Sequence, residues 1–432
     1  MRQQILVYCF LVVCLALSCT DGTGMQFGKE PTPDSGGQVV IDTGQNQPPD
    51  QRNPVVDQGN PVVDQGNPVV DQGNPVVDQN NTPDPGTTVP DKTVTPEPST
   101  PEPPAPENNT QPEPEPVVPE KPTVPEPVKE APPVVHKPFS FIAMGDAGTG
   151  STKQKKIAMA IKKKCDAEKS KRPCGFAILL GDNFYDIGVK SATDPQFKTK
   201  FSDMYNFLGF PFYITIGNHD YGVAGLGGIG SNYQKAKYYL AYAKTNPVFV
   251  LPDRFYAFNK GNTSFVSLNT SEMFFNHDMK KQNAFIKKAV ADANTRKSVW
   301  KIAFGHHPYI SNGTHGNAGN YDVFIKGLPN PIPIVNGSFI KRHFDAEICN
   351  KFDFYFSGHD HNRQLLHPKC GIYHVVSGAG AKSKGWGKGK KNAVYFAKDT
   401  IGFFFVHVDG RKITIEALDE NAKVEFTKVY TK

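Results

Sequence analysis

The chain has 432 residues and a formal net charge of +6, but its charge and its proline are unevenly divided. Residues 20–136 hold 26 of the 37 prolines, with 5 Lys or Arg against 19 Asp or Glu, a net of −14. Residues 137–432 hold 42 Lys or Arg against 23 Asp or Glu, a net of +19, and Arg2 brings the sum to +6. These contrasts exclude a single uniform globule and predict one folded domain of about 290 residues, near the upper size for one core.

Residues 1–19 have the pattern of a signal peptide. Arg2 and the α-amine give a positive start, and the apolar run at residues 5–17 is too short to span a bilayer, which needs about 20 residues. Small residues at Ala16 and Ser18 suit an ordinary cleavage site. They also resemble a bacterial lipoprotein box with an acylated Cys19, although Leu is more usual where Ala16 stands. Both alternatives predict export, either by secretion or to the outer cell envelope on a lipid anchor.

The segment from 20 to 136 lacks the pattern of a folded core. The heptapeptide NPVVDQG begins at residue 53 and recurs through residue 80, and its proline in every unit excludes a continuous coiled coil. A Pro-Glu and Pro-Thr stretch at 93–133 is expected to be extended and polyproline-like. We interpret the segment as a disordered acidic tether that holds the folded domain away from a membrane. The alternatives are a low-complexity tail without a specific task and a partner-binding segment.

Four cysteines lie beyond the leader, namely Cys165, Cys174, Cys349 and Cys370. An even number in an exported protein predicts two disulfides. Three pairings exist, and we favour Cys165–Cys174 and Cys349–Cys370 because each pair brackets one step between neighbouring elements. A zinc site is the competing interpretation, but the chain has no Cys-x-x-Cys spacing.

From residue 137 onward, short apolar strands alternate with Lys-rich amphipathic segments, as in an α/β domain. Five strands are expected, at 139–144, 176–180, 212–216, 299–304 and 352–356. Each leads within two residues into glycine, and each glycine is followed directly by a polar side chain: Asp146, Asp182, Asn218, His306 and His359. Because strand carboxyl ends are where α/β sheets build their sites, we expect these side chains to converge.

The converging groups are carboxylates, an amide, imidazoles and the phenol of Tyr185, without a thiolate. Oxygen donors with some imidazole suit Fe, Mn or Zn. Seven candidate ligands are too many for one ion, so the set predicts two metals that share a carboxylate, about 3.5–4 Å apart.

These motifs resemble the five metal-binding blocks of the purple acid phosphatases, within the calcineurin-like metallophosphoesterases. The blocks are Asp146, Asp182-x-x-Tyr185, Asn218-His219, His306 and His359-x-His361. The run from 181 to 221 is more similar to the small, tartrate-resistant type than to the large plant type. The resemblance covers nearly all of 137–432 and none of the tether, and Tyr185 is its most specific element. It implies an α/β fold that is a four-layer αββα sandwich of two mixed β-sheets, with the metals at the strand ends along one edge.

Carried over by position, the resemblance implies a dinuclear centre. Fe(III) would be held by Asp146, Tyr185 and His361. A divalent Fe, Zn or Mn would be held by Asn218, His306 and His359, and Asp182 would bridge the two ions. Charge transfer from the phenolate to Fe(III) colours this family, so the oxidised protein is expected to be purple.

The function implied is that of an exported acid phosphatase, which hydrolyses phosphomonoesters by attack of a metal-bound hydroxide. His219 and His315 are similar in position to the substrate-side histidines of the family and are the candidates for protonating the leaving group. The expected partner is a small phosphate ester, bound by a monomeric catalytic domain. The same site could serve a phosphodiesterase or nucleotidase, a catalytically silent binding protein displayed on the envelope, or redox generation of reactive oxygen.

A lysine-rich stretch at 382–391 surrounds Trp386. Three interpretations stay open: a solvated loop, a positive field that steers anionic esters to the site, and nucleic-acid binding. Because the chain has no nucleic-acid-binding module signature, no nucleic-acid partner is expected.

Overall fold

The computed structural model describes residues 137–224, 228–321, 336–387 and 392–432. The expectations for the leader and the tether concern residues 1–136 and lie outside the described residues. None of the helices in the described part is both long and apolar enough to cross a bilayer.

Two seven-stranded sheets form the centre of the folded part. The first has the order β16-β15-β14-β1-β2-β3-β4. Its strands are β1 (Phe139–Met144), β2 (Cys174–Leu180), β3 (Phe212–Thr215), β4 (Phe249–Val250), β14 (Gly402–Asp409), β15 (Lys412–Asp419) and β16 (Val424–Thr431). Strands β1 to β4 are parallel, and β14 joins β1 in the antiparallel sense.

The second sheet has the order β13-β11-β12-β10-β7-β6-β5. Its strands are β5 (Tyr256–Lys260), β6 (Thr263–Ser267), β7 (Trp300–Phe304), β10 (Phe354–Ser357), β11 (Arg363–Leu366), β12 (Tyr373–Ser377) and β13 (Val394–Lys398). Strands β6, β7, β10 and β12 are parallel, whereas β5 and β11 run antiparallel to their neighbours. A short hairpin pairs β8 (Gly316–Asn317) with β9 (Asn320–Tyr321).

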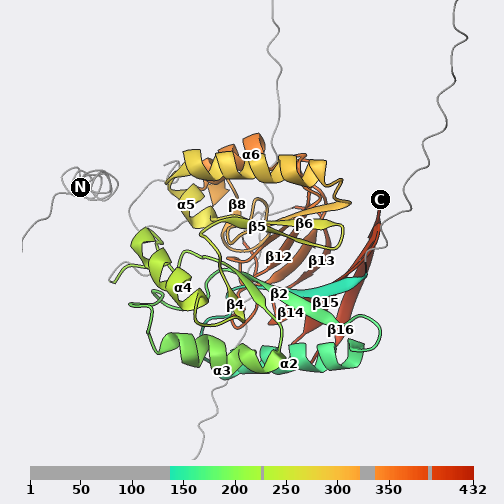
Figure 1. Ribbon diagram of the computed structural model, residues 1–432, viewed down its shortest axis with the longest axis horizontal. Coiled ribbons are helices and arrows are strands. Elements are labelled where there is room, and N and C mark those ends of the chain that lie inside the picture. The colour runs from blue at the N-terminus through green and yellow to red at the C-terminus, as the bar shows by residue number, and fades with distance from the viewer. Residues whose placement is uncertain (1–136, 225–227, 322–335, 388–391) are drawn as a thin grey trace, which may run out of the picture. The chain divides into compact units, whose positions relative to one another are not determined.

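Helices cover the outer faces of both sheets (Figure 1). The α-helices are α2 (Thr152–Glu168), α3 (Asp203–Tyr205), α4 (Ala236–Ala243), α5 (Thr270–Phe274), α6 (Met279–Thr295) and α7 (Ser338–Glu347). Single turns of other helix types are η1 (Lys198–Ser202), η2 (Asn206–Leu208) and η3 (Tyr233–Lys235). In the view of Figure 1, α2 and α3 lie below the first sheet and α6 lies above the second. The four-layer αββα sandwich predicted from the sequence is therefore confirmed.

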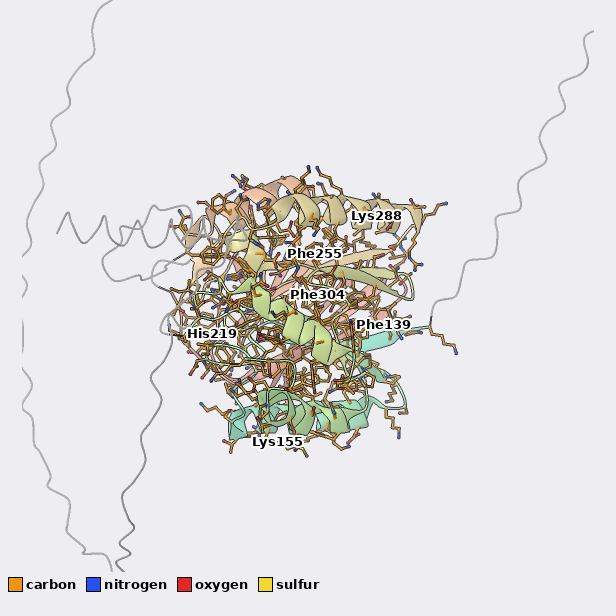
Figure 2. All side chains as sticks on the ribbon, turned by 60° about the vertical axis from the view of Figure 1, so that its left-hand side comes forward. Phe139, Lys155, His219, Phe255, Lys288 and Phe304 are labelled. Atoms are coloured by element: carbon orange, nitrogen blue, oxygen red, sulfur yellow. A yellow bond between two sulfur atoms is a disulfide. The ribbon has the colours of Figure 1, made fainter. Side chains whose placement is uncertain are left out.

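Aromatic side chains join the two sheets. Phe141 of β1 packs edge-on against Phe265 of β6, with ring centroids 5.4 Å apart, and against Phe356 of β10 at 5.8 Å. Figure 2 shows Phe304 between the layers, with Lys155 and Lys288 on the outer helical faces. The parallel strands are buried on both faces, which explains why β1 has an almost continuous apolar sequence.

Two disulfides connect neighbouring elements in the pairing favoured from the sequence. Cys165 near the end of α2 is bonded to Cys174 at the start of β2. Cys349, which follows α7, is bonded to Cys370, which precedes β12. Closing such loops stabilises the fold by restricting the unfolded chain, and both bonds agree with an oxidising compartment.

Candidate metal centre

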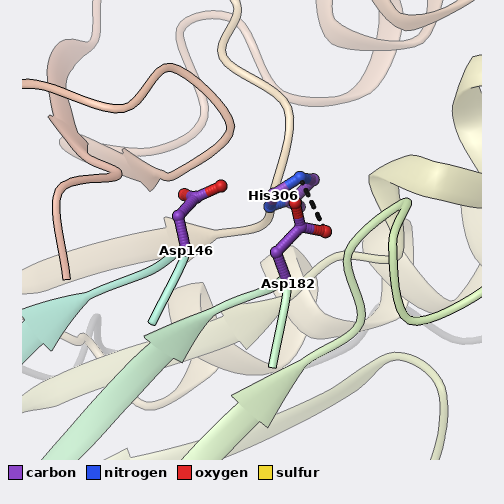
Figure 3. A group of neighbouring side chains, drawn as sticks. All are labelled: Asp146, Asp182 and His306. Carbon is purple, nitrogen blue, oxygen red and sulfur yellow. Dashed lines mark ion pairs between the residues drawn. The ribbon is translucent and has the colours of Figure 1, made fainter. Parts of the chain in front are cut away.

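Polar side chains from both sheets meet where the parallel strands end. Asp146 and Asp182 lie two residues beyond β1 and β2, and Figure 3 shows them beside His306, which lies two residues beyond β7. Asn218 follows β3, and His359 follows β10. In Figure 2, His219 lies on the opposite side of the domain from Phe139, the first residue of β1. The convergence expected from the five strand ends is thus observed.

The backbone at these strand ends is held in unusual conformations. Asp146, Asp182 and His359 have φ of 57°, 52° and 70°, a region that residues other than glycine seldom adopt. The preceding glycines allow the loops to approach closely. A Cβ added to Gly217 would lie 2.2 Å from Asp182 Oδ1, and one on Gly358 would lie 2.5 Å from Asp146 Oδ2. The loops can therefore converge only with glycine at these two positions.

One half of the site is formed by Asp146, Tyr185 and His361. The Tyr185 hydroxyl donates to Asp146 Oδ1 at 2.9 Å. His361 Nε2 lies 3.2 Å from the same hydroxyl and 3.4 Å from the same carboxylate oxygen. Burial, and then the neighbouring carboxylates of Asp146 and Asp182, raise the pKa of the Tyr185 phenol well above its usual value. A phenolate ligand here would therefore require a cation beside it.

The other half is centred on His306. Its Nε2 lies 2.7 Å from Asn218 Oδ1, 3.1 Å from His359 Nδ1 and 3.3 Å from Asp182 Oδ1. Its Nδ1 lies 2.8 Å from the Leu180 carbonyl, which can only accept, so Nδ1 carries a proton. In its neutral form, which is the form that can bind a metal, the ring presents the lone pair of Nε2 to the site.

The orientation of Asn218 gives a direct test of whether this set fits a metal. Its Nδ2 donates to the Gly228 carbonyl at 2.5 Å, which turns Oδ1 towards His306. With the His306 ring in its neutral form, lone pairs on the Asn218 amide, the ring and the Asp182 carboxylate face one another. That arrangement is repulsive by itself and favourable around a cation. The donor set therefore fits a metal ion.

Carboxylates link the two halves. The facing ligand atoms of Asp146, Asp182 and His306 lie within 4.8 Å of one another, and all three residues are buried. The backbone N–H of His359 donates to Asp146 Oδ2 at 2.7 Å. Burial opposes ionisation of Asp182, but the positive charge that His306 and His219 carry when protonated outweighs it and lowers the pKa to about 2. Asp182 lies between the groups proposed for the two ions, where a bridging carboxylate is expected.

The two histidines expected on the substrate side border this set. His219 is 26 % exposed, its ring lies 4.5 Å from that of Tyr185, and its Nδ1 lies 2.5 Å from the Asp186 carbonyl. His315 lies 4.0 Å from His359 between ring centroids, and burial chiefly lowers its pKa. Both rings therefore lie directly beside proposed metal ligands.

Three further residues support the site. His307 is buried with its ring 4.4 Å from that of His359. Thr270 Oγ1 accepts from the backbone N–H groups of His306 at 3.0 Å and His307 at 2.9 Å. Asp360 accepts from the His315 N–H at 2.8 Å. Thr270 was not identified from the sequence, because no local motif marks it.

Comparison with known proteins places the domain among phosphoesterases. A family model described as calcineurin-like phosphoesterase matches residues 139–363, which include all seven proposed ligands. Purple acid phosphatase 3 of Arabidopsis thaliana is 27% identical over 305 residues, covering 65% of this chain and 74% of that protein. Tartrate-resistant acid phosphatase type 5 of Homo sapiens is 25% identical over 283 residues, covering 58% of this chain and 77% of that protein.

A solved structure shows the same fold. The purple acid phosphatase PPD1 from yellow lupin (Lupinus luteus) superposes with a TM-score of 0.50 at 16% identity, covering 68% of this chain and 54% of that one. At this identity the likeness concerns the arrangement of the sheets and helices alone.

Proposed function

Because the chain belongs to the calcineurin-like phosphoesterase family, we propose that it is an exported dimetal acid phosphatase that hydrolyses phosphomonoesters. The observation that carries the proposal is the set of potential ligand atoms around His306, whose Nε2 lies 2.7–3.3 Å from atoms of Asn218, His359 and Asp182. The acid phosphatases among its relatives, at 25–29% identity, support the finer assignment. The two disulfides support export.

The proposed ligands divide into two groups that share Asp182. Asp146, Tyr185 and His361 would hold Fe(III), because a phenolate is a hard anionic donor. The neutral side chains of Asn218, His306 and His359 would hold a divalent Fe, Zn or Mn. Two bound ions would supply Lewis-acid activation of water and neutralisation of the phosphoryl charge.

Side chains of the protein would orient the ester and supply the proton. The Asp186 carbonyl accepts from Nδ1 of His219, so Nε2 of that ring is the atom that can face the ester. Asp360 holds the backbone of His315 and thereby fixes the second imidazole beside His359. These two rings would orient the phosphoryl group and deliver a proton to the departing oxygen. The Tyr185 and His219 rings pack together, so a ligand and a substrate-side residue position each other.

The test is metal content, visible spectrum and ester turnover of the purified full chain. We expect about two transition-metal ions per chain, including iron, a visible charge-transfer band and faster turnover of an aryl phosphate than of a diester. Tyr185→Phe should bleach the band, because it removes the phenolate donor. Tyr238→Phe, on α4, is the matched control and should keep it. A preparation that contains no transition metal and turns over no ester would overturn the proposal, and preferred turnover of the diester would redirect it to phosphodiesterase chemistry.

A further inference from the structure

A loop between β12 and β13 borders the candidate metal centre. The backbone N–H of Lys384 donates to the carbonyl of His361 at 2.8 Å. The ammonium of Lys382 lies 3.4 Å from the centroid of the Tyr185 ring. Two of the proposed ligands are therefore in direct contact with this loop, which the structure describes up to Gly387 and again from Asn392.

The same loop carries an exposed indole. Trp386 is 43% exposed, whereas Trp300, the other tryptophan of the chain, is only 2% exposed. The backbone of Trp386 pairs with Gly313, and the Gly387 N–H donates to the Asn312 carbonyl at 2.9 Å. The backbone that carries the indole is thus attached to the segment that leads into His315.

The attachment between these loops is close. A Cβ on Gly313 would lie 2.2 Å from Asp360 Cγ, so the backbone of this segment lies directly against Asp360. Asp360 in turn accepts from the His315 N–H at 2.8 Å. Trp386 is therefore connected through Gly313 to the residues that hold one of the two substrate-side imidazoles.

An exposed indole and an exposed ammonium on one loop have a defined binding chemistry. A planar ring can stack on an indole face, and every nucleobase offers such a ring. Lys384 is exposed and can pair with an anionic group as a flexible point charge. An alkyl phosphate offers no ring for the indole, so this loop would favour esters that carry one.

We infer that Trp386 and Lys384 form a subsite for the leaving group, and that the preferred substrates are nucleotides. This inference rests on the phosphatase activity proposed above. The base would stack on Trp386, and in a nucleoside diphosphate the phosphate nearer the sugar would pair with Lys384. In the reaction, a water oxygen bonds to the terminal phosphorus, the bond from phosphorus to the leaving oxygen breaks, and that oxygen takes up a proton.

The kinetic test compares three esters on the full chain: adenosine monophosphate, adenosine diphosphate and glycerol 3-phosphate. Trp386→Ala should raise KM for adenosine monophosphate roughly fivefold or more, the effect of losing one base–aromatic stack, with a smaller change for glycerol 3-phosphate. Trp386→Phe should restore most of the preference. Phe207→Ala removes another exposed aromatic, 41% exposed in η2, and is the control that should leave the preference unchanged.

Lys384→Gln tests the second contact. It should raise KM roughly two- to fivefold for the diphosphate relative to the monophosphate, with a difference that shrinks at high salt. Equal losses for all three esters in Trp386→Ala would show that the indole only supports the loop, and would overturn the inference. Unchanged kinetics for all three would overturn it as well.

Tryptophan fluorescence gives a readout that does not depend on turnover. Adenosine monophosphate should quench the emission of exposed Trp386, glycerol 3-phosphate should not, and Trp386→Phe should abolish the response. Turnover of nucleotides without quenching would overturn the subsite and leave the phosphatase proposal standing. Quenching without turnover of any ester would support the subsite and overturn the phosphatase proposal.

Discussion

Asp220 connects two of the loops that carry proposed ligands, although it is not one of them. Its Oδ2 accepts from the Gly217 N–H and from Asn183 Nδ2, each at 2.8 Å, and its Oδ1 accepts from the Phe184 N–H at 3.0 Å. These donors belong to the loops that present Asn218 on one side and Asp182 on the other. A single buried carboxylate therefore sets the spacing between two ligand-bearing loops.

Asp220→Ala should leave these buried donors unpaired and loosen both loops. We expect metal affinity to fall roughly 10- to 100-fold, as is usual when a group that orients ligands is removed. Titration of the metal-free protein, followed by the visible band, measures the change. Asp409→Ala, at the exposed end of β14, should bind metal as the parent does. Unchanged metal affinity in Asp220→Ala would show that the loops hold their positions without it.

At the residue scale, the sequence predicted those site residues that a local motif marks. Asp146 and His306 are recognisable because each follows glycine at the end of an apolar strand. Thr270 is not recognisable, since the N–H that it accepts from belongs to His306, 36 positions away in the chain. The importance of such a residue arises from a tertiary contact, which the neighbouring sequence does not indicate.

At the scale of elements, an ion-pair network anchors the end of α2 to β15. Lys164 lies 2.7 Å from both Glu168 and Glu416, and Arg172 pairs with the same two carboxylates. The hydrogen bond from Arg172 is the largest influence on Glu168 and, with Lys164, lowers its pKa to about 2 despite partial burial. The ionised form of Glu168 is therefore favoured in the folded protein.

Glu168→Gln should destabilise the domain by roughly 1–3 kcal/mol near neutral pH, between the values for exposed and buried pairs. The pKa of Glu168 is about 2 in the folded protein and 4.5 for an unperturbed glutamate. Its ionic contribution to the free energy of unfolding is therefore complete above about pH 4.5 and is lost as the pH falls towards 2. The gap in unfolding free energy between parent and variant should close over that range, as measured by denaturant titration. Asp166→Asn, an exposed position on the same helix, should show no comparable gap. A gap that is independent of pH would argue that packing, not charge, is lost.

Contacts with distant segments explain where two of the elements begin or end. Helix α2 continues beyond Lys164, whose ammonium pairs with Glu416 of β15, to Glu168. The strand expected at 352–356 begins instead at Phe354, which pairs with Ile302 of β7 and Tyr373 of β12. Both boundaries are set by contacts with distant segments, which hydrophobic periodicity does not report.

At the scale of the whole molecule, sheet order was beyond local reasoning. Strand β1 lies between β2 and β14, and Phe139 is opposite Val408 in this pairing. Alternating apolar and amphipathic segments indicated an α/β class, but many sheet orders satisfy that pattern. The two-sheet sandwich was expected only through resemblance to a known family. The prediction that the structure confirms therefore came from that resemblance more than from periodicity.

The position of β1 makes a prediction about the boundary of the domain. It is a central strand that begins at Phe139, and Phe141 is buried with its ring 5.2 Å from Phe176 and 5.4 Å from Phe265. A variant lacking residues 1–136 keeps every one of these contacts. We therefore expect it to fold, to retain its kcat, and to unfold within about 2 °C of the parent in a thermal melt followed by circular dichroism.

A variant lacking residues 1–141 is the matched control, since it removes five more residues and with them the first half of β1. It takes Phe141 out of the contact between the two sheets and should fail to fold, because losing a fully buried phenylalanine alone costs about 3–5 kcal/mol and the strand's hydrogen bonds are lost with it. If removing residues 1–136 already lowered the melting temperature by more than about 5 °C, the acidic segment would have to pack on the basic domain. Its net charge of −14 against +19 would then be the first interaction to examine, by repeating the melt at high salt, where attraction between exposed charges is screened.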